Sequence, residues 1–318
     1  MRSKKASSFT AACLILALVA VSCATIPPVM DVKVELTDEQ IARGKYLVEG
    51  VSACGACHTP GPQGGAFHFE ADLVAEKHLA GAKFEEDVFT VYSSNITPDV
   101  ETGIGSWTDG EIIRAIREGV DKDGKTLFVL MPYVDFKDMS DNDVKAVVAY
   151  LRTIPPVKNK VPEPTVQRIA FPLNIIIPLS TRPNPAVRDV PDPPAGDPVA
   201  RGKYLTTIGG CIGCHTPGQP PDMSKRMAGG NAFKGPWGTV YAANLTPDPE
   251  TGVLKKYNNH EEIIENFRAG AMKPPMRHLA SSFYKEMTDE DMRAILSYLR
   301  SLPPIRNKVP EPEGYIEE

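Results

Sequence analysis

The stretch Cys54-Gly55-Ala56-Cys57-His58 returns later in the chain as Cys211-Ile212-Gly213-Cys214-His215. Two cysteines at this spacing can each form a thioether to a haem vinyl group, and the histidine that follows can bind the haem iron. A zinc site, the first alternative, needs four ligands. A redox disulfide, the second, does not need the trailing histidine. The two motifs therefore predict two covalently bound haem c groups.

The two motifs lie at matching places in an internal repeat. Arg43–Leu47 (RGKYL) returns as Arg201–Leu205, and Asn95–Asp99 (NITPD) returns as Asn244–Asp248 (NLTPD). Neither copy shows the sustained alternation of apolar and polar residues that indicates strands, and both show apolar residues at helical spacing. The pattern predicts an all-α fold of two tandem domains, each built around one haem.

The start and end signals of the helices support this fold class. Thr37 with Gln40, and Thr108 with Glu111, have the spacing of a capping box at a helix start. Asp197 followed by Pro198 fits an N-cap and a first helical residue in the second copy. We therefore place the domains at residues 37–157 and 196–318.

Residues 158–195, between the two copies, are rich in proline, of which the whole chain has 30. Proline-rich linkers are extended and semi-rigid. We expect this linker to hold the two domains at a set separation, and we expect its apolar stretch Ile175–Ile177 to pack on a domain.

The N-terminal residues predict export. A basic start and a short apolar run, residues 1–22, are typical of a secretory signal. The ending Ala20-Val21-Ser22-Cys23 resembles the lipobox of bacterial lipoproteins, which predicts a lipid on Cys23 and a tether over residues 23–36. An ordinary signal peptide with an incidental cysteine is the alternative. We expect a protein on the periplasmic side of a bacterial membrane, lipid-anchored at Cys23, because c-type haem attachment implies assembly outside the cytoplasm.

The charge balance limits the partners. The chain has a formal net charge of −5 at neutral pH. A mildly acidic surface argues against a nucleic-acid partner and suits a basic patch on a redox protein.

A second axial ligand separates electron carriers from enzymes, and cytochromes c use histidine and methionine. In the first copy, Met131 stands in a Met-Pro-Tyr stretch 73 residues after His58. Met139 is the competitor, but it directly precedes a predicted N-cap and has a twin in Met287. We therefore expect Met131 to bind the first iron and Met139 to be structural.

The second copy offers more than one candidate for the second axial ligand. Met276 follows two prolines, 61 residues after His215. Met272 and His278 lie nearby, and a histidine ligand would give a lower potential than a methionine. We predict Met276, with the other two left open.

A few further aromatic and histidine residues have uncertain roles. His68, His78 and His260 have no counterparts in the other copy, and we expect surface positions for them. Trp107 stands where the second copy has Tyr257. Its ring N–H could donate to a haem propionate, or the ring could pack in the core.

In its haem motifs and repeated segments, the chain resembles the bacterial multihaem cytochrome c subunits of membrane-associated alcohol and gluconate dehydrogenases, and their dihaem relatives. The likeness covers residues 37–318, and its most specific part runs from Asn95-Ile-Thr-Pro-Asp to Met131-Pro-Tyr. It departs in having two haem motifs where those subunits typically have three, and in lacking their frequent C-terminal membrane anchor.

The resemblance implies a cytochrome c fold in each half. It assigns Cys54, Cys57, His58 and Met131 to haem one, and Cys211, Cys214, His215 and Met276 to haem two. In such cytochromes the first and last helices cross closely. We expect Gly44 and Gly202 to be the points of close approach, with Tyr150 and Tyr298 packing on the crossings.

The leading functional hypothesis is a dihaem electron carrier without catalytic residues of its own. It would take electrons from a dehydrogenase and pass them to a downstream cytochrome or oxidase. The alternative is a dihaem enzyme of the peroxidase or thiosulfate dehydrogenase type, which needs an open iron and acid–base groups. A third hypothesis is a haem-bearing link in an extracellular assembly. Methionines in both loops favour the carrier.

Overall fold

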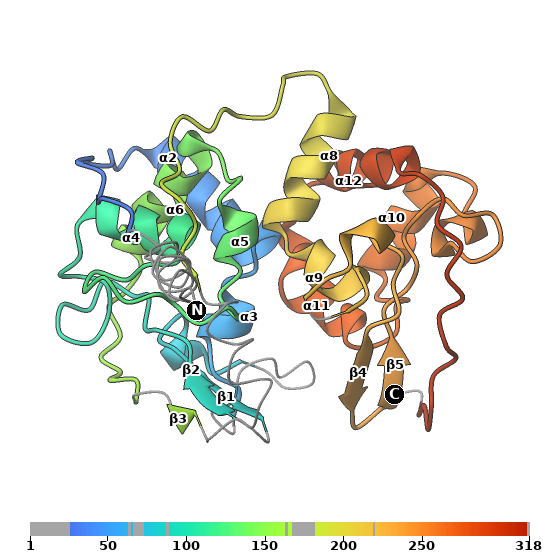
Figure 1. Ribbon diagram of the computed structural model, residues 1–318, viewed down its shortest axis with the longest axis horizontal. Coiled ribbons are helices and arrows are strands. Elements are labelled where there is room, and N and C mark those ends of the chain that lie inside the picture. Colours follow the sequence, from blue (N-terminus) through green and yellow to red (C-terminus); the bar gives the residue numbers. More distant parts are fainter. Residues whose placement is uncertain are drawn as a thin grey trace, which may run out of the picture.

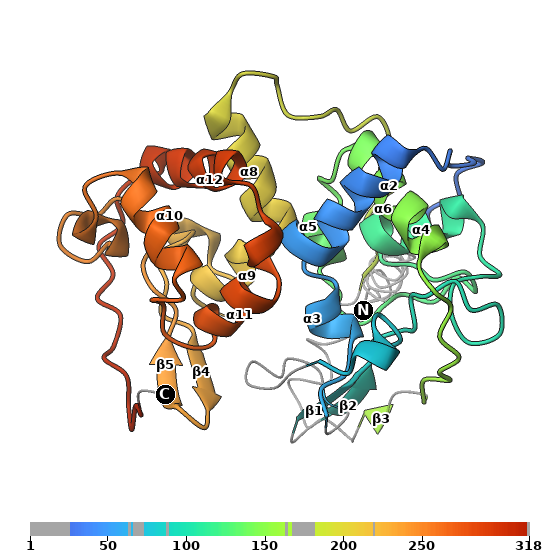
Figure 2. The ribbon, with the colours of Figure 1, turned by 180° about the vertical axis from the view of Figure 1, so that it is seen from behind.

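The computed structural model describes residues 26–62, 65, 73–86, 89–162, 165–166, 182–218 and 220–316. In this part of the chain, two lobes lie beside each other, and each is formed by one copy of the repeat (Figure 1). Figure 2 shows the same two lobes from behind. We call the lobe of residues 26–166 lobe 1 and the lobe of residues 198–316 lobe 2.

Lobe 1 carries its elements in the following order: α2 (Asp38–Lys45), the π-helical turn η1 (Tyr46–Val51), α3 (Gly55–His58), η2 (Ala75–Lys77), β1 (Lys83–Glu86), β2 (Phe89–Tyr92), α4 (Asp109–Glu118), α5 (Tyr133–Phe136), α6 (Asp141–Thr153) and β3 (Thr165–Val166).

Lobe 2 repeats this order: α8 (Pro198–Ile208), α9 (Cys211–His215), η3 (Met223–Lys225), β4 (Ala232–Gly235), β5 (Gly238–Tyr241), η4 (Val253–Lys256), α10 (His260–Arg268), α11 (Met276–Ser282), η5 (Tyr284–Glu286) and α12 (Asp289–Ser301).

Side chains cap the N-termini of these helices where the sequence predicts. The hydroxyl oxygen of Thr37 accepts the backbone N–H three residues on, and α2 begins directly after it. Asp197 does the same for α8, with Pro198 as the first helical residue. Thr108 and Glu111 form a reciprocal capping box at the start of α4. The predicted starts of all three helices are confirmed.

The first and last helices of each lobe cross at a glycine. A Cβ atom added to Gly44 would overlap the carbonyl oxygen of Ala146 on α6 and press on the Cβ of Tyr150. Gly202 meets Ala294 on α12 in the same way. The crossings are visible in Figure 1, with α2 against α6 and α8 against α12. The predicted close approach is confirmed in both lobes.

Two small sheets, which the sequence does not predict, accompany the helices. In lobe 1, β1 and β2 form an antiparallel hairpin in which Phe84 pairs with Val91, and β3 pairs with β2. In lobe 2, β4 and β5 form the matching hairpin with Phe233 paired to Val240. The hairpin strands are four residues long, too short for their alternation to stand out from a helical pattern.

The described part of the predicted linker lies along lobe 1. Asn184 donates its backbone N–H to the carbonyl of Glu118, 3.0 Å away, and Val187 donates to the Glu118 carboxylate, 2.8 Å away. The backbone N–H of Asp141 donates to the carbonyl of Val190 at 2.9 Å. The lobes also contact each other directly, through η1 with η5 and α5 with α8. Direct packing between lobes therefore sets their spacing, and the linker is not a free spacer.

Within the residues that the structure describes, no helix combines the length and the apolar character needed to cross a membrane. The predicted signal over residues 1–22, the proposed lipid site Cys23, His68 and the apolar stretch Ile175–Ile177 all lie outside the described residues. The expectations on them stay predictions.

Candidate functional site

The first motif sits on a single helical turn. Cys54 caps α3, and the backbone N–H of His58 donates to the Cys54 carbonyl at 2.9 Å. The His58 Nδ1 atom lies 2.7 Å from the carbonyl oxygen of Ser94. A carbonyl can only accept, so Nδ1 carries the proton and Nε2 keeps a lone pair for a metal. Burial lowers the pKa of His58, with the Ser94 bond opposing, and this keeps the imidazole neutral as ligation requires.

The second motif repeats this geometry. Helix α9 begins at Cys211 and ends at His215. The His215 Nδ1 atom lies 2.9 Å from the carbonyl oxygen of Ala243, which fixes the same tautomer. Burial lowers the pKa of His215, again with its backbone hydrogen bond opposing. Both imidazoles are therefore oriented and neutral, as haem-iron ligands are.

Sequence reasoning did not identify Ser94 and Ala243, because each acts through its backbone carbonyl. Both directly precede the repeated Asn-x-Thr-Pro-Asp segments. The side-chain amide of Asn95 donates to the carbonyl of Val157 at 2.8 Å, and that of Asn244 donates to Ile305 at 2.8 Å. These bonds tie the segment behind each histidine to the chain that follows the last helix. The repeated asparagine is thus the sequence signal that could have located the carbonyls.

The thiols fit thioether formation better than either alternative. Burial raises the pKa of Cys54, Cys57 and Cys211 to about 12, and raises the pKa of Cys214. A redox disulfide motif depends on a lowered thiol pKa. Among the described residues, no group of three or more histidine, cysteine or acidic side chains could hold a metal ion, as a zinc site would require.

Met131 lies in the turn that leads into α5. Its side chain is partly buried and packs against the hydrophobic core. Met139 is almost completely buried, at 2% exposure, directly before the N-cap Ser140. Met131 is thus more exposed than Met139, as expected if Met131 is a loop ligand and Met139 a core residue. Met131 as the axial ligand stays a prediction.

Met276 is the first residue of α11, a helix of 7 residues where lobe 1 has the 4-residue α5. The difference of three residues matches the insertion between Met276 and Met287. His278 stands in the same helix, and its ring centroid lies 5.7 Å from that of Trp237. Met272, Met276 and His278 are therefore all held near one another, and Met276 stays the predicted ligand.

One buried donor in lobe 2 fits a haem carboxylate. Trp237 is 1% exposed, and its indole Nε1–H has no acceptor among the residues that the structure describes. A buried N–H without an acceptor is costly, and a haem propionate would supply one. Trp107, for which the sequence left open this role or core packing, is partly buried and packs against the hydrophobic core, as does Tyr257.

The two motifs face each other across the interface between the lobes. Cys214 is close enough to Cys57 for its charge to add to the effect of burial in raising the pKa of Cys57. Tyr284 is partly buried near Cys57, Cys211 and Cys214, and its hydroxyl donates to the Gly209 carbonyl at 3.2 Å. Figures 1 and 2 both show α3 next to α9 and α11. Nothing in the sequence motifs indicates this juxtaposition.

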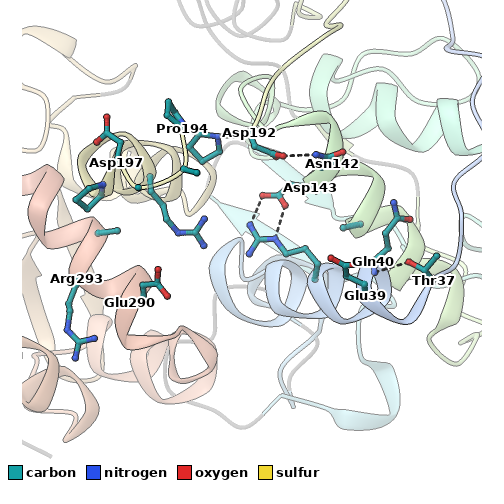
Figure 3. Close-up of a pocket in the computed structure, with 18 of the residues that line it drawn as sticks. Thr37, Glu39, Gln40, Asn142, Asp143, Asp192, Pro194, Asp197, Glu290 and Arg293 are labelled. Atoms are coloured by element: carbon teal, nitrogen blue, oxygen red, sulfur yellow. Dashed lines mark hydrogen bonds and ion pairs between the residues drawn. The ribbon is translucent and has the colours of Figure 1, made fainter.

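A separate cleft of about 980 Å³ lies between the lobes. It is lined by α2, α6, the end of the linker and the facing sides of α8 and α12, and by none of the haem-motif residues (Figure 3). Some of its polar side chains bind one another: Arg43 pairs with Asp143 at 2.7 Å, and the Asn142 amide donates to Asp192 at 2.6 Å. The cleft is therefore a polar gap in the interface.

Two helical lobes, each with an oriented imidazole behind a paired-cysteine turn, have the arrangement by which a c-type cytochrome holds covalently bound haem. The sequence model of the cytochrome c family matches residues 41–155 and 199–303, one segment in each lobe. The chain belongs to the cytochrome c family.

Curated relatives narrow the class. The cytochrome c subunit of the quinone-dependent alcohol dehydrogenase of Gluconobacter oxydans is 32% identical over 86% of this chain and 56% of its own length. The cytochrome c subunit of gluconate 2-dehydrogenase of Pantoea cypripedii is 30% identical over 84% of this chain and 60% of its own length. A dihaem c-type cytochrome of Cereibacter sphaeroides is 30% identical over 84% of this chain and 87% of its own length. The chain thus spans little more than half of the dehydrogenase subunits.

Proposed function

We propose that this protein is a dihaem electron-transfer cytochrome. The observation that carries the proposal is the pairing of two motifs, each with its histidine oriented by a backbone carbonyl, across one interface. When bound, each haem supplies a one-electron Fe(III)/Fe(II) couple. Because the motifs face each other, an electron would cross only a short distance between the two haem sites.

The chain's own residues hold and tune these groups. Cys54 and Cys57 would carry the first haem and Cys211 and Cys214 the second, with His58 and His215 as the proximal ligands. Met131 and Met276 would supply the sixth ligands, and a thioether ligand raises the reduction potential. His58 is buried and His215 is partly buried, so little of either imidazole is open to water.

The partners follow from the relatives and the charge. We propose that a dehydrogenase is the electron donor, because the relatives include cytochrome subunits of alcohol and gluconate dehydrogenases. A downstream cytochrome or oxidase would be the acceptor, and a basic patch on either partner would complement the net charge of −5. We place the protein on the periplasmic side of a bacterial membrane, held by a lipid on Cys23.

The test is spectroscopic. The purified protein should contain two haems per chain, measured by the absorbance of the pyridine haem complex against protein mass. Low-temperature EPR of the oxidised form should show two low-spin centres, and carbon monoxide should not bind the reduced form.

A high-spin signal, or carbon monoxide binding at one haem, would contradict the carrier. An open iron would turn attention to the enzyme hypothesis, with lobe 2 and His278 as the candidate site. Peroxide and thiosulfate turnover would then be measured with the same preparation.

A further inference from the structure

Equivalent positions five residues after the crossing glycines differ in charge. In lobe 1 this position is Glu49, and in lobe 2 it is Thr207. The Glu49 Oε1 atom accepts a hydrogen bond from the Tyr150 hydroxyl at 2.7 Å and lies 2.8 Å from the Nε2 atom of His78. The buried Thr207 hydroxyl donates to the backbone carbonyl of Lys203 at 2.8 Å. Lobe 1 therefore has a carboxylate where lobe 2 has a neutral hydroxyl.

The surroundings of Glu49 favour its charged form. Burial by itself would raise the pKa of Glu49, but the hydrogen bonds to His78 and Tyr150, and the charge of Lys45, outweigh it. The pKa of Glu49 accordingly lies below its ordinary value. The side chain is about four-fifths buried, so its charge is poorly screened by solvent.

The charged side chains that act on the two attachment sites are not equivalent. Glu49 directly follows Val48, whose carbonyl accepts the backbone N–H of Cys54 at 2.9 Å. After burial and Cys57, Glu49 is the further charge that raises the pKa of Cys54. Cys211 is influenced by Asp135, from lobe 1, and by Arg226, and their charges are opposite in sign. Burial also raises the pKa of Asp135, with Arg226 opposing. The first attachment site thus has a carboxylate as its neighbour, and the second has a carboxylate and a guanidinium of opposite charge.

We infer that Glu49 makes the first haem site the lower-potential site of the pair. The inference rests on the proposed electron-transfer function. A ferric haem carries one more positive charge than a ferrous haem, so a nearby buried carboxylate stabilises the oxidised state. The half-reduced protein then holds its electron at the second motif, in lobe 2. In that exchange, one electron leaves the first iron and one electron enters the second.

The experiment is a potentiometric titration of the two-haem protein, followed by absorbance and repeated with Glu49→Gln. Titrations at pH 8 avoid the range in which histidines usually change charge. The wild type should show two one-electron waves. The isosteric Glu49→Gln change should raise the midpoint potential of the lower wave by about 59 mV. For one electron, this is about a tenfold change in the equilibrium constant. The upper wave should move much less.

Two further variants separate charge from structure. Glu39→Gln removes the same charge from an exposed position on α2 and should leave both waves in place. Glu49→Asp keeps the charge while it disturbs the packing, and its lower wave should stay nearer to the wild type than that of Glu49→Gln.

The inference is overturned if Glu49→Gln moves the upper wave as far as the lower wave, moves neither wave, or shifts the lower wave no more than Glu49→Asp does. In each of these cases the two low-spin haems would still support the proposed function. Loss of one haem from the wild type, or carbon monoxide binding to it, would instead contradict the proposed function.

Discussion

The hydroxyl of Tyr46 in lobe 1 donates to the Oδ2 atom of Asp291 in lobe 2, at 2.6 Å. The equivalent bond runs in the opposite direction, from Tyr204 of lobe 2 to the Oδ2 atom of Asp143 in lobe 1, also at 2.6 Å. The interface therefore has the reciprocal form of a two-fold contact, although both halves belong to one chain.

Each aspartate in this pair of bonds is already held by an arginine of its own lobe. Arg43 binds both oxygens of Asp143, at 2.8 and 2.7 Å, and Arg201 binds Asp291 in the same two-pronged way. The Arg43–Asp143 pair borders the cleft in Figure 3. Because the aspartates are buried, each tyrosine completes the hydrogen bonding of a charge that solvent cannot reach.

Replacing Tyr46 by Phe should weaken the contact between the lobes. A buried hydrogen bond to a charged group contributes about 1.5–3 kcal/mol, so the free energy of unfolding should fall by that order. Urea unfolding of the haem-loaded protein would measure it. Tyr241→Phe is the control, because Tyr241 bonds Glu313 at an exposed site within lobe 2 and should cause no measurable change. An equal loss in both variants would contradict an interfacial role.

Replacing Gly202 by Ala should force α8 away from α12. The added methyl would overlap the Ala294 carbonyl, and overpacking of this kind costs about 1–3 kcal/mol or more. The thermal midpoint of the haem-loaded protein should fall by several degrees. Gly213→Ala is the matched control, since nothing lies within 4 Å of that position and Ala56 occupies it in the first motif. The control should be neutral or slightly stabilising.

Glu49 predicts a pH-dependent contribution to stability. Its pKa in the fold lies below the ordinary value of 4.5, so ionisation stabilises the folded state above that pH. The contribution is lost as the pH falls through the lowered pKa. Glu49→Gln should therefore be less stable than the wild type at pH 7, and the difference should shrink below pH 4.5. Urea unfolding at several pH values tests this, with Glu39→Gln expected to follow the wild type throughout.

Met131→Leu should open the sixth position of the first haem. The predicted result is a high-spin EPR signal and carbon monoxide binding by one haem of two, because leucine offers no ligand atom. Met139→Leu changes the same residue type at a core position and should leave both haems low-spin. If the two variants had the same spectra, Met131 would not be the ligand. The same comparison applies to Met276 and Met287 in lobe 2.

Cys23→Ser should release the exported protein from the membrane. The expectation follows from the lipobox-like ending of the signal, in which Cys23 would carry the lipid. Fractionation of cells expressing the wild type and the variant measures the distribution, with mass spectrometry of the N-terminal peptide as the direct readout. A wild type found without lipid would contradict the prediction, and the ordinary signal peptide would then stand.

Local features of the fold could be predicted because short segments carry them. The haem motifs, the N-caps Thr37 and Asp197 and the crossing glycines each depend on residues close in sequence or on a position repeated in both copies. The hairpins were missed because four-residue strands are defined by their partners more than by their own pattern. The histidine-orienting carbonyls were missed because a backbone atom has no residue type.

The sequence by itself determined that this chain holds two haem-attachment turns on a duplicated helical frame, since covalent chemistry and helix capping need only neighbouring residues. The tertiary structure alone decided how the copies meet. Tyr46 and Asp291 are 245 positions apart, and nothing local to either indicates their bond. Glu49 likewise becomes distinctive only where packing buries it beside Cys54. Charge and hydrogen bonding act through space, so partners brought together by folding decide how the two copies of the repeat differ.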